Sequence, residues 1–140
     1  MITLSGGETE TQDKEFLKQH EEVLYIWQAR EKEESVKWAE KLAGSCKIKP
    51  YSTKEDFKQA TAIFIGGGST EKLTEFLQGI KEELKEWVTQ GKPLLGVSAG
   101  ARALGTEGIG ILPFPIRVHS HQLEIPEGTH ITITKEVKTK

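Results

Sequence analysis

One serine in this sequence lies in a pattern suited to nucleophilic catalysis. Residues 96–100 read Gly-Val-Ser-Ala-Gly, so Ser98 stands at the centre of a G-x-S-x-G motif. Such a serine needs small neighbours, because the backbone turns sharply there between a strand and a helix. The N–H groups at the start of the following helix then face the negative charge that develops when a carbonyl is attacked. The pentapeptide alone fits an ordinary glycine-rich turn equally well, so its surroundings must decide.

A second glycine-rich segment, Gly66-Gly67-Gly68, precedes this motif and follows a predicted apolar strand. The carboxyl ends of neighbouring parallel strands meet at one crevice. We therefore expect the N–H of Gly67 or Gly68 to lie beside Ser98, where together with the N–H of Ala99 it would form an oxyanion hole. Phosphate binding is the competing interpretation, but neither the P-loop spacing nor the dinucleotide-binding spacing is present.

The elements that would position these segments alternate as strand and helix. Strands are predicted at residues 2–6, 22–27, 46–52, 61–65 and 93–97, and helices at 13–20, 31–43 and 73–88. Near-continuous apolar strands between amphipathic helices indicate a parallel sheet that is covered on both faces. The sequence therefore predicts an α/β protein, a three-layer α/β/α sandwich with a mostly parallel central sheet.

Three segments refine this expectation. Residues 73–88 form the clearest amphipathic pattern and predict a single long helix. The strand at 46–52 is expected near the edge of the sheet, because Pro50 cannot donate to a strand ladder. After residue 105 the pattern changes to short β-branched segments, which predict strands and loops without a long helix.

Bulk properties exclude several classes of protein. The 140 residues suit one domain spanning 1–140, with a frayed tail at 135–140. A net charge of −2 argues against a nucleic-acid partner. The sequence has no apolar run of the roughly 20 residues that span a bilayer. It also has no pattern of a signal peptide, and Cys46 has no second cysteine to pair with. A cytoplasmic location without membrane association is therefore expected.

Three motifs in a fixed order resemble the dipeptidase E and cyanophycinase family of serine peptidases. They are IFIGGGST, GVSAGA and GIGILPFPIRVH, and the resemblance covers roughly residues 60–120. The resemblance implies a class I glutamine-amidotransferase-like sandwich and a serine–histidine–acid triad. It also implies a small peptide as substrate and a mechanism that needs neither a metal nor an organic cofactor.

The resemblance assigns the remaining members of the triad. The family's histidine follows the proline of its third motif by six residues, which leads from Pro113 to His119. The family's acid is a glutamate often set in a Pro-Glu-Gly turn, and Glu127 occupies that position here. Glu107 and Glu124 are the alternatives for the acid. Two features depart from the family: Ser69 replaces the usual asparagine of the glycine loop, and the stretch after His119 is short.

Other interpretations of these residues stay open. His119 and His121 form a His-Ser-His pair, which also fits a solvent-facing strand or a metal-like pair, although two histidines without a third ligand are a weak zinc signal. Arg102 and Arg117 are candidates to bind a substrate carboxylate, or are ordinary surface arginines.

The main function hypothesis is a serine hydrolase that cleaves a peptide or related amide bond. Its rival is a non-catalytic binding or assembly module that retains the fold. A glutaminase is disfavoured because the motif carries serine and Cys46 lies elsewhere. Whether the chain forms a homo-oligomer stays open.

Overall fold

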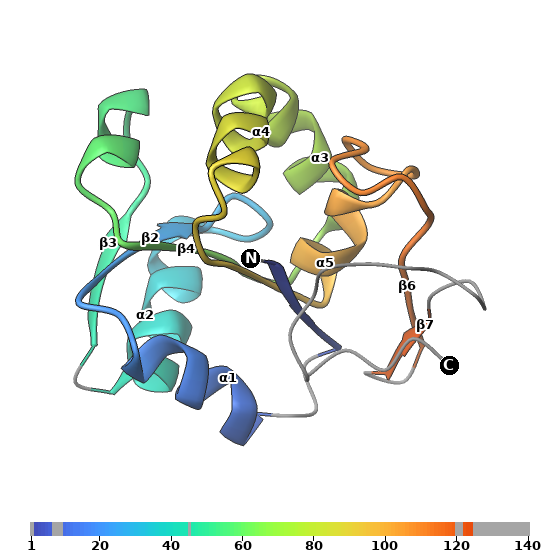
Figure 1. Cartoon of the computed structure of the whole chain (residues 1–140). Helices are drawn as coiled ribbons and strands as arrows, with labels where there is room; N and C mark the ends of the chain where they lie inside the picture. Colours follow the sequence, from blue (N-terminus) through green and yellow to red (C-terminus); the bar gives the residue numbers. More distant parts are fainter. Residues whose placement is uncertain (1, 7–9, 45, 120–121, 125–140) are drawn as a thin grey trace.

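The computed structural model of the chain describes residues 2–6, 10–44, 46–119 and 122–124 (Figure 1). Strands and helices alternate over most of this length, as the sequence predicts. The elements are β1 (Ile2–Ser5), α1 (Glu10–Lys18), β2 (Glu22–Ile26), α2 (Lys32–Ala43), β3 (Lys47–Pro50), the 3₁₀ helix η1 (Lys54–Lys58), β4 (Ala62–Ile65), α3 (Thr70–Gln78), α4 (Lys81–Thr89), β5 (Leu94–Val97), α5 (Ala99–Leu104), β6 (Arg117–His119) and β7 (Gln122–Glu124).

Five strands form one parallel sheet in the order β1-β5-β4-β2-β3. Strand β5 lies between β1 and β4, and its register places Val97 beside Ser5 and Gly96 beside Ile65. The predicted edge position of the Pro50 strand is confirmed, since β3 pairs with β2 on one side. Strands β6 and β7 pair antiparallel in a separate hairpin. The carboxyl ends of β4 and β5 therefore lie side by side, as the proposed site requires.

Helices cover both faces of this sheet (Figure 1). Helices α1 and α2 lie on one face, where Leu17 and Leu42 pack with Tyr25 and Phe64. Helices α3, α4 and α5 lie on the other face, where their apolar side chains pack with alternate residues of the same strands. The side chains of β4 and β5 are buried on both faces, which explains why these strands are apolar throughout. The predicted three-layer sandwich is confirmed.

The prediction of one long helix over 73–88 is wrong, because the segment forms two helices, α3 and α4. Gly79 ends α3, and its N–H donates to the Phe76 carbonyl at 3.1 Å. The Ile80 N–H donates to the Leu77 carbonyl at 3.0 Å, so the turn tightens to a three-residue spacing before α4 begins. Both helices bury their apolar stripes in the same cluster, which is why the periodicity continues through the break.

No helix among the residues that the structure describes combines the length and the apolarity needed to cross a bilayer. The predicted tail at 135–140 lies outside the described residues.

Candidate active site

Ser98 connects β5 to α5 in a strained backbone conformation. Its φ is 55° and its ψ is −111°, and among the described non-glycine residues it alone has a positive φ. The Ser98 N–H donates to the Ser5 carbonyl at 2.8 Å, which ties the turn to the neighbouring strand β1. Its carbonyl accepts from the N–H groups of Ala101 and Arg102, both at 3.0 Å, so α5 begins immediately. The G-x-S-x-G motif thus has the strand–turn–helix context that its sequence predicts.

The side chain of Ser98 is left available by this arrangement. It is half-buried, and it makes no capping hydrogen bond to α5. A serine at the start of a helix ordinarily accepts a bond from the helix backbone. Here Ser98 does not take that role, and no hydrogen bond joins its hydroxyl to another of the residues that the structure describes.

The glycine loop after β4 lies directly against Ser98. A Cβ built on Gly67 would lie 3.2 Å from Ser98 Cβ and 3.7 Å from Ser98 Oγ, so residue 67 has to be small. Gly68 has a φ of 141°, which side chains disfavour. Ser69 then caps α3, and its hydroxyl accepts from the Lys72 N–H at 3.2 Å. The structure therefore brings together Ser98 and the loop that the sequence predicts beside it.

Ala99 is the first residue of α5 and is buried. The first N–H groups of a helix have no partner within that helix, and they carry the positive end of its dipole. The main-chain donors predicted for an oxyanion hole, on Gly67, Gly68 and Ala99, thus come from two segments that meet at one end of the sheet.

Two of the predicted substrate-binding residues lie around one acidic side chain. Arg117 donates to both carboxylate oxygens of Glu107, at 3.4 Å from Nε and 2.9 Å from Nη2. The hydrogen bonds from Arg117 and its charge lower the pKa of Glu107, and the charge of Arg102 adds to the effect. Arg117 and Glu107 therefore form an ion pair with each other. This pairing was not predictable, since it depends on the path of the loop after α5.

Arg102 and Glu107 also line an open cavity of about 730 Å³ together with the start of α3. Gly68 and Ser69 form its wall on the side of the glycine loop, which places the cavity next to the Ser98 turn. The cavity carries Glu71, Glu75 and Glu107 beside Arg102, so its lining mixes both signs of charge.

The structure describes only part of the predicted triad. His119 is the last residue of β6, where its backbone pairs with Gln122 of β7. Strand β7 contacts β1, the strand whose Ser5 carbonyl holds the Ser98 N–H. Glu124 ends β7. Glu127 and His121 lie outside the described residues. Within the described part of the chain, no three metal-ligating side chains form a group.

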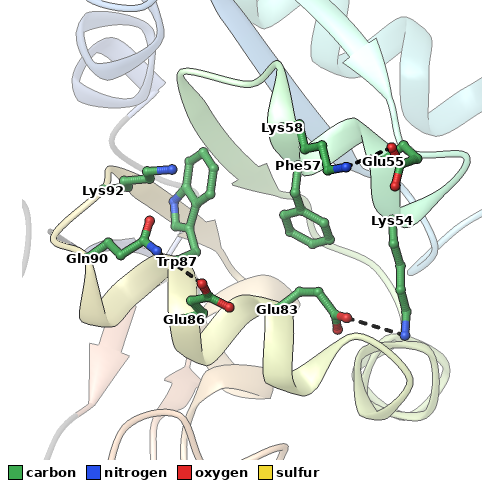
Figure 2. A pocket seen from close by; sticks show the side chains of 9 residues that line it. All are labelled: Lys54, Glu55, Phe57, Lys58, Glu83, Glu86, Trp87, Gln90 and Lys92. Atoms are coloured by element: carbon green, nitrogen blue, oxygen red, sulfur yellow. Dashed lines mark hydrogen bonds and ion pairs between the residues drawn. The ribbon is translucent and has the colours of Figure 1, made fainter.

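A second cavity, of about 360 Å³, lies between η1 and α4 (Figure 2). Figure 2 shows Phe57 beside Trp87, with ring centroids 6.4 Å apart, and Lys54 paired with Glu83 at 3.4 Å. Lys92 stands 4.8 Å from the Trp87 ring centroid. Because Lys92 precedes β5 and Ser98 follows it, this groove belongs to the opposite end of that strand. Two ion pairs, Lys54 with Glu83 and Lys58 with Glu55, lie among its lining residues.

The turn after β2 also reaches the site, and the sequence interpretation overlooked it. The Ser69 N–H donates to the Ala29 carbonyl at 2.8 Å, and the Cγ of Arg30 would lie 2.6 Å from a Cβ on Gly68. Their place in the sequence was the available signal, because they follow an apolar strand and sites form at the carboxyl ends of parallel strands.

The chain is similar to known peptidases in sequence and in fold. Residues 1–112 match the model of a family described as peptidase family S51. The fold is similar to that of a putative peptidase E from Listeria monocytogenes EGD-e, with a TM-score of 0.57 and 21% identity over 74% of this chain and 59% of that one. A peptidase from an acI-B1 actinobacterium gives a TM-score of 0.56 and 23% identity over 80% of this chain and 64% of that one.

A further similarity is to the pyridoxal 5'-phosphate synthase subunit PdxT of three strains of Saccharolobus islandicus. Each is 37% identical over 70 residues, which are 49% of this chain and 35% of the relative. The chain thus matches about a third of the length of these relatives and less than two thirds of the two solved peptidase structures. The structural similarities confirm the class I glutamine-amidotransferase-like fold.

Proposed function

Because the chain belongs to peptidase family S51, we propose that it is a serine hydrolase that cleaves a peptide or related amide bond. One observation carries the proposal: Ser98 turns between β5 and α5 with a φ of 55°, beside the glycine loop. Backbone strain of this kind costs about 1–3 kcal/mol and persists where the surrounding structure enforces it, commonly at functional sites. A plain glycine-rich turn would not need it at a serine.

In the proposed reaction, Ser98 Oγ attacks the carbonyl carbon of the scissile amide. The His119 imidazole accepts the hydroxyl proton and then delivers it to the leaving amine, which yields an acyl-enzyme that water hydrolyses. Main-chain N–H groups of Gly68 and Ala99 stabilise the oxyanion, and Gly67 leaves room for it. Glu127 holds the imidazole in the tautomer that accepts the proton. No metal or organic cofactor enters these steps.

The substrate is proposed to be a small peptide that lies in the cavity beside the glycine loop. Arg102 lines this cavity, which supports a role in binding a carboxylate. Arg117 would do so only by exchanging its bond with Glu107 for one with the substrate. We propose a cytoplasmic location, with no nucleic-acid or membrane partner; the net charge of −2 supports the absence of a nucleic-acid partner.

Labelling with a serine-directed fluorophosphonate tests the proposal. The wild type should be labelled at Ser98, and Ser98→Ala should abolish labelling. His119→Ala should slow it by about 100-fold or more, because without a base the hydroxyl is a poor nucleophile at neutral pH. Mass spectrometry of the labelled peptide identifies the residue. A folded wild type that is never labelled would instead support the non-catalytic binding or assembly module.

The acid of the triad is tested by three matched substitutions, Glu127→Gln, Glu107→Gln and Glu124→Gln. Glu127→Gln should lower the rate of peptide hydrolysis by orders of magnitude, because the imidazolium formed during attack loses its partner. Glu107→Gln should give a much smaller loss, since Glu107 pairs with Arg117 at an exposed position. If Glu107→Gln or Glu124→Gln gives the larger loss, the role passes to that residue.

A further inference from the structure

Tyr25 lies on β2, and its side chain reaches the glycine loop. Its partner on β4 is Phe64, and the two rings lie 5.0 Å apart on the face covered by α1 and α2. Side chains alternate along a strand, so a side chain at position 66, two residues beyond Phe64, would point to that same face. The Tyr25 hydroxyl already occupies this place. A Cβ built on Gly66 would meet the hydroxyl and would also lie 2.9 Å from Cε1 of the ring.

The same hydroxyl is held from the side of α2. It shares a hydrogen bond of 2.7 Å with Ser35 Oγ, and both residues are buried. Burial raises the pKa of Tyr25, although the Ser35 hydrogen bond and the Arg30 charge act in the opposite direction. The hydroxyl therefore stays protonated at neutral pH and adds no negative charge beneath the loop. It is an uncharged group fixed between α2 and the main chain of Gly66.

The turn after β2 holds the other end of the loop. The Ala29 carbonyl accepts from the Ser69 N–H at 2.8 Å, and a Cβ on Gly68 would lie 2.9 Å from the carbonyl carbon of Ala29. Gly67 lies between these two points of attachment, and it faces Ser98. The position of the loop is therefore set at both ends by β2 and the turn that follows it.

We propose that Tyr25 is a positioning residue, whose hydroxyl keeps the glycine loop and its main-chain N–H groups in place beside Ser98. The inference rests on the proposed hydrolase function, in which those groups stabilise the oxyanion. Without the hydroxyl, Gly66 can move toward the vacated space, and the N–H groups that follow it move as well. Oxyanion stabilisation requires donors at the right distance from the developing charge, so a small displacement lowers the rate of attack and leaves substrate binding unchanged.

Saturation kinetics of fluorophosphonate labelling test the proposal, because they separate the rate constant of the covalent step, kinact, from the binding constant KI. Tyr25→Phe keeps the ring against Phe64 and removes only the hydroxyl. It should lower kinact by about 10- to 100-fold and change KI by less than about 2-fold. Partial unfolding would instead raise the apparent KI or reduce the labelled fraction, with kinact unchanged.

Ser35→Ala tests whether the hydrogen bond to Tyr25 contributes to this effect. The variant should lower kinact to a smaller extent, because it releases the hydroxyl without removing it. Combined with Tyr25→Phe, it should cause no further loss, since Ser35 acts through the hydroxyl that is already absent. An additive loss in the double variant would contradict this route.

Two further variants serve as matched controls. Tyr51→Phe removes the hydroxyl of another buried tyrosine, which packs against Phe57 and Phe76 on the other face of the sheet. Leu42→Ala loosens the apolar cluster that contains Tyr25. Both variants should keep the wild-type kinact, although Leu42→Ala should lower the free energy of unfolding.

Three results overturn the inference: a Tyr25→Phe protein with the wild-type kinact, an equal loss of kinact in Tyr51→Phe, or an equal loss in Leu42→Ala. The wild type separates this failure from failure of the hydrolase. Labelling of wild-type Ser98 together with one of these results refutes the role of Tyr25 alone. A folded wild type that is never labelled refutes the hydrolase and, with it, the role of Tyr25.

Discussion

At the scale of single residues, the contact between Gly67 and Ser98 bears directly on the proposed chemistry. A methyl group on residue 67 would lie 3.2 Å from Ser98 Cβ, closer than most side-chain contacts, so the serine or the loop would have to shift. Gly67 itself does not have a positive φ, so alanine is tolerated by its backbone. A substitution at position 67 should therefore change the position of Ser98 without straining the backbone of residue 67.

Gly67→Ala should therefore slow fluorophosphonate labelling by about 10- to 100-fold, because misplacing a reacting group by a fraction of an ångström lowers the rate by such factors. The free energy of unfolding should change little. Gly91→Ala is the control: Gly91 has a φ of 75° with open space around it, so alanine costs about 1–2 kcal/mol of stability there. That variant should be labelled at the wild-type rate, and the reverse pattern would contradict the prediction.

The sequence was sufficient to predict the backbone of Ser98 but not the partners of the arginines. G-x-S-x-G between a strand and a helix requires a sharp turn, and the positive φ of Ser98 follows from it. The pairing of Arg117 with Glu107, and the position of Arg30 over Gly68, depend on how separate loops approach one another. No local pattern encodes such an approach. The assignments of His119 and Glu127 to the triad remain predictions.

At the scale of elements, η1 is held by a reciprocal cap. Asp56 accepts from the N–H of Ser52 at 2.7 Å and of Thr53 at 3.0 Å, and the Thr53 hydroxyl accepts in return from the Glu55 N–H. Burial acts to raise the pKa of Asp56, but these hydrogen bonds, a bond from the Ser52 hydroxyl and the charge of Lys49 outweigh it and lower the pKa. The cap therefore favours the ionised carboxylate.

Asp56→Asn should destabilise the protein by about 1 kcal/mol at neutral pH, in the range for lost helix caps. The pKa of Asp56 is lower in the folded state than in the unfolded state. Its contribution is thus complete above the unfolded pKa and disappears as the pH falls through the folded pKa. The difference between wild type and variant, measured by urea unfolding at a series of pH values, should shrink in acid.

Glu55→Gln is the matched control, since it removes an exposed ion pair with Lys58 and leaves the cap intact. It should cost less than about 0.5 kcal/mol. An Asp56→Asn effect that stays constant down to strongly acid pH would contradict the assigned role.

The elements themselves were largely predictable, and the exception has a physical reason. Apolar runs located four strands of the parallel sheet, and alternating polarity located β3. The break between α3 and α4 was missed because Leu77, Ile80 and Leu84 keep a helical spacing across it. Hydrophobic periodicity indicates which face of a helix is buried. Two consecutive helices that pack against the same side of one sheet can keep the same periodicity. Gly79 was the available signal, since glycine is a poor residue for the interior of a helix.

At the scale of the whole molecule, two apolar clusters share one sheet. Leu84 lies in the cluster under α3–α5, and Leu42 in the cluster under α1 and α2. The same strands contribute alternate residues to both clusters, so neither can lose its packing alone. The described part of the chain should therefore unfold as one cooperative unit.

Leu84→Ala and Leu42→Ala should each lower the free energy of unfolding by about 2–5 kcal/mol through the cavity they leave. Urea unfolding followed by tryptophan fluorescence and by far-UV circular dichroism should give coincident transitions in both variants. Lys85→Ala, at an exposed position of α4, should change stability by less than about 0.5 kcal/mol. Transitions that separate in one variant would show that the two faces unfold independently.

The strand order has a consequence for how the chain acquires its shape during synthesis. Among the described strands, β1 is synthesised before the others, yet its partner in the sheet is β5, which ends at Val97. At about 5–20 residues per second, translation reaches Val97 roughly 5–20 s after β1 is made. Strands β2, β3 and β4 can associate in that interval, whereas Ile2 and Leu4 must wait. In a nascent chain that stalls before residue 94, the backbone hydrogen-bonding groups and apolar side chains of β1 would stay unpaired. They could then bind chaperones or other nascent chains.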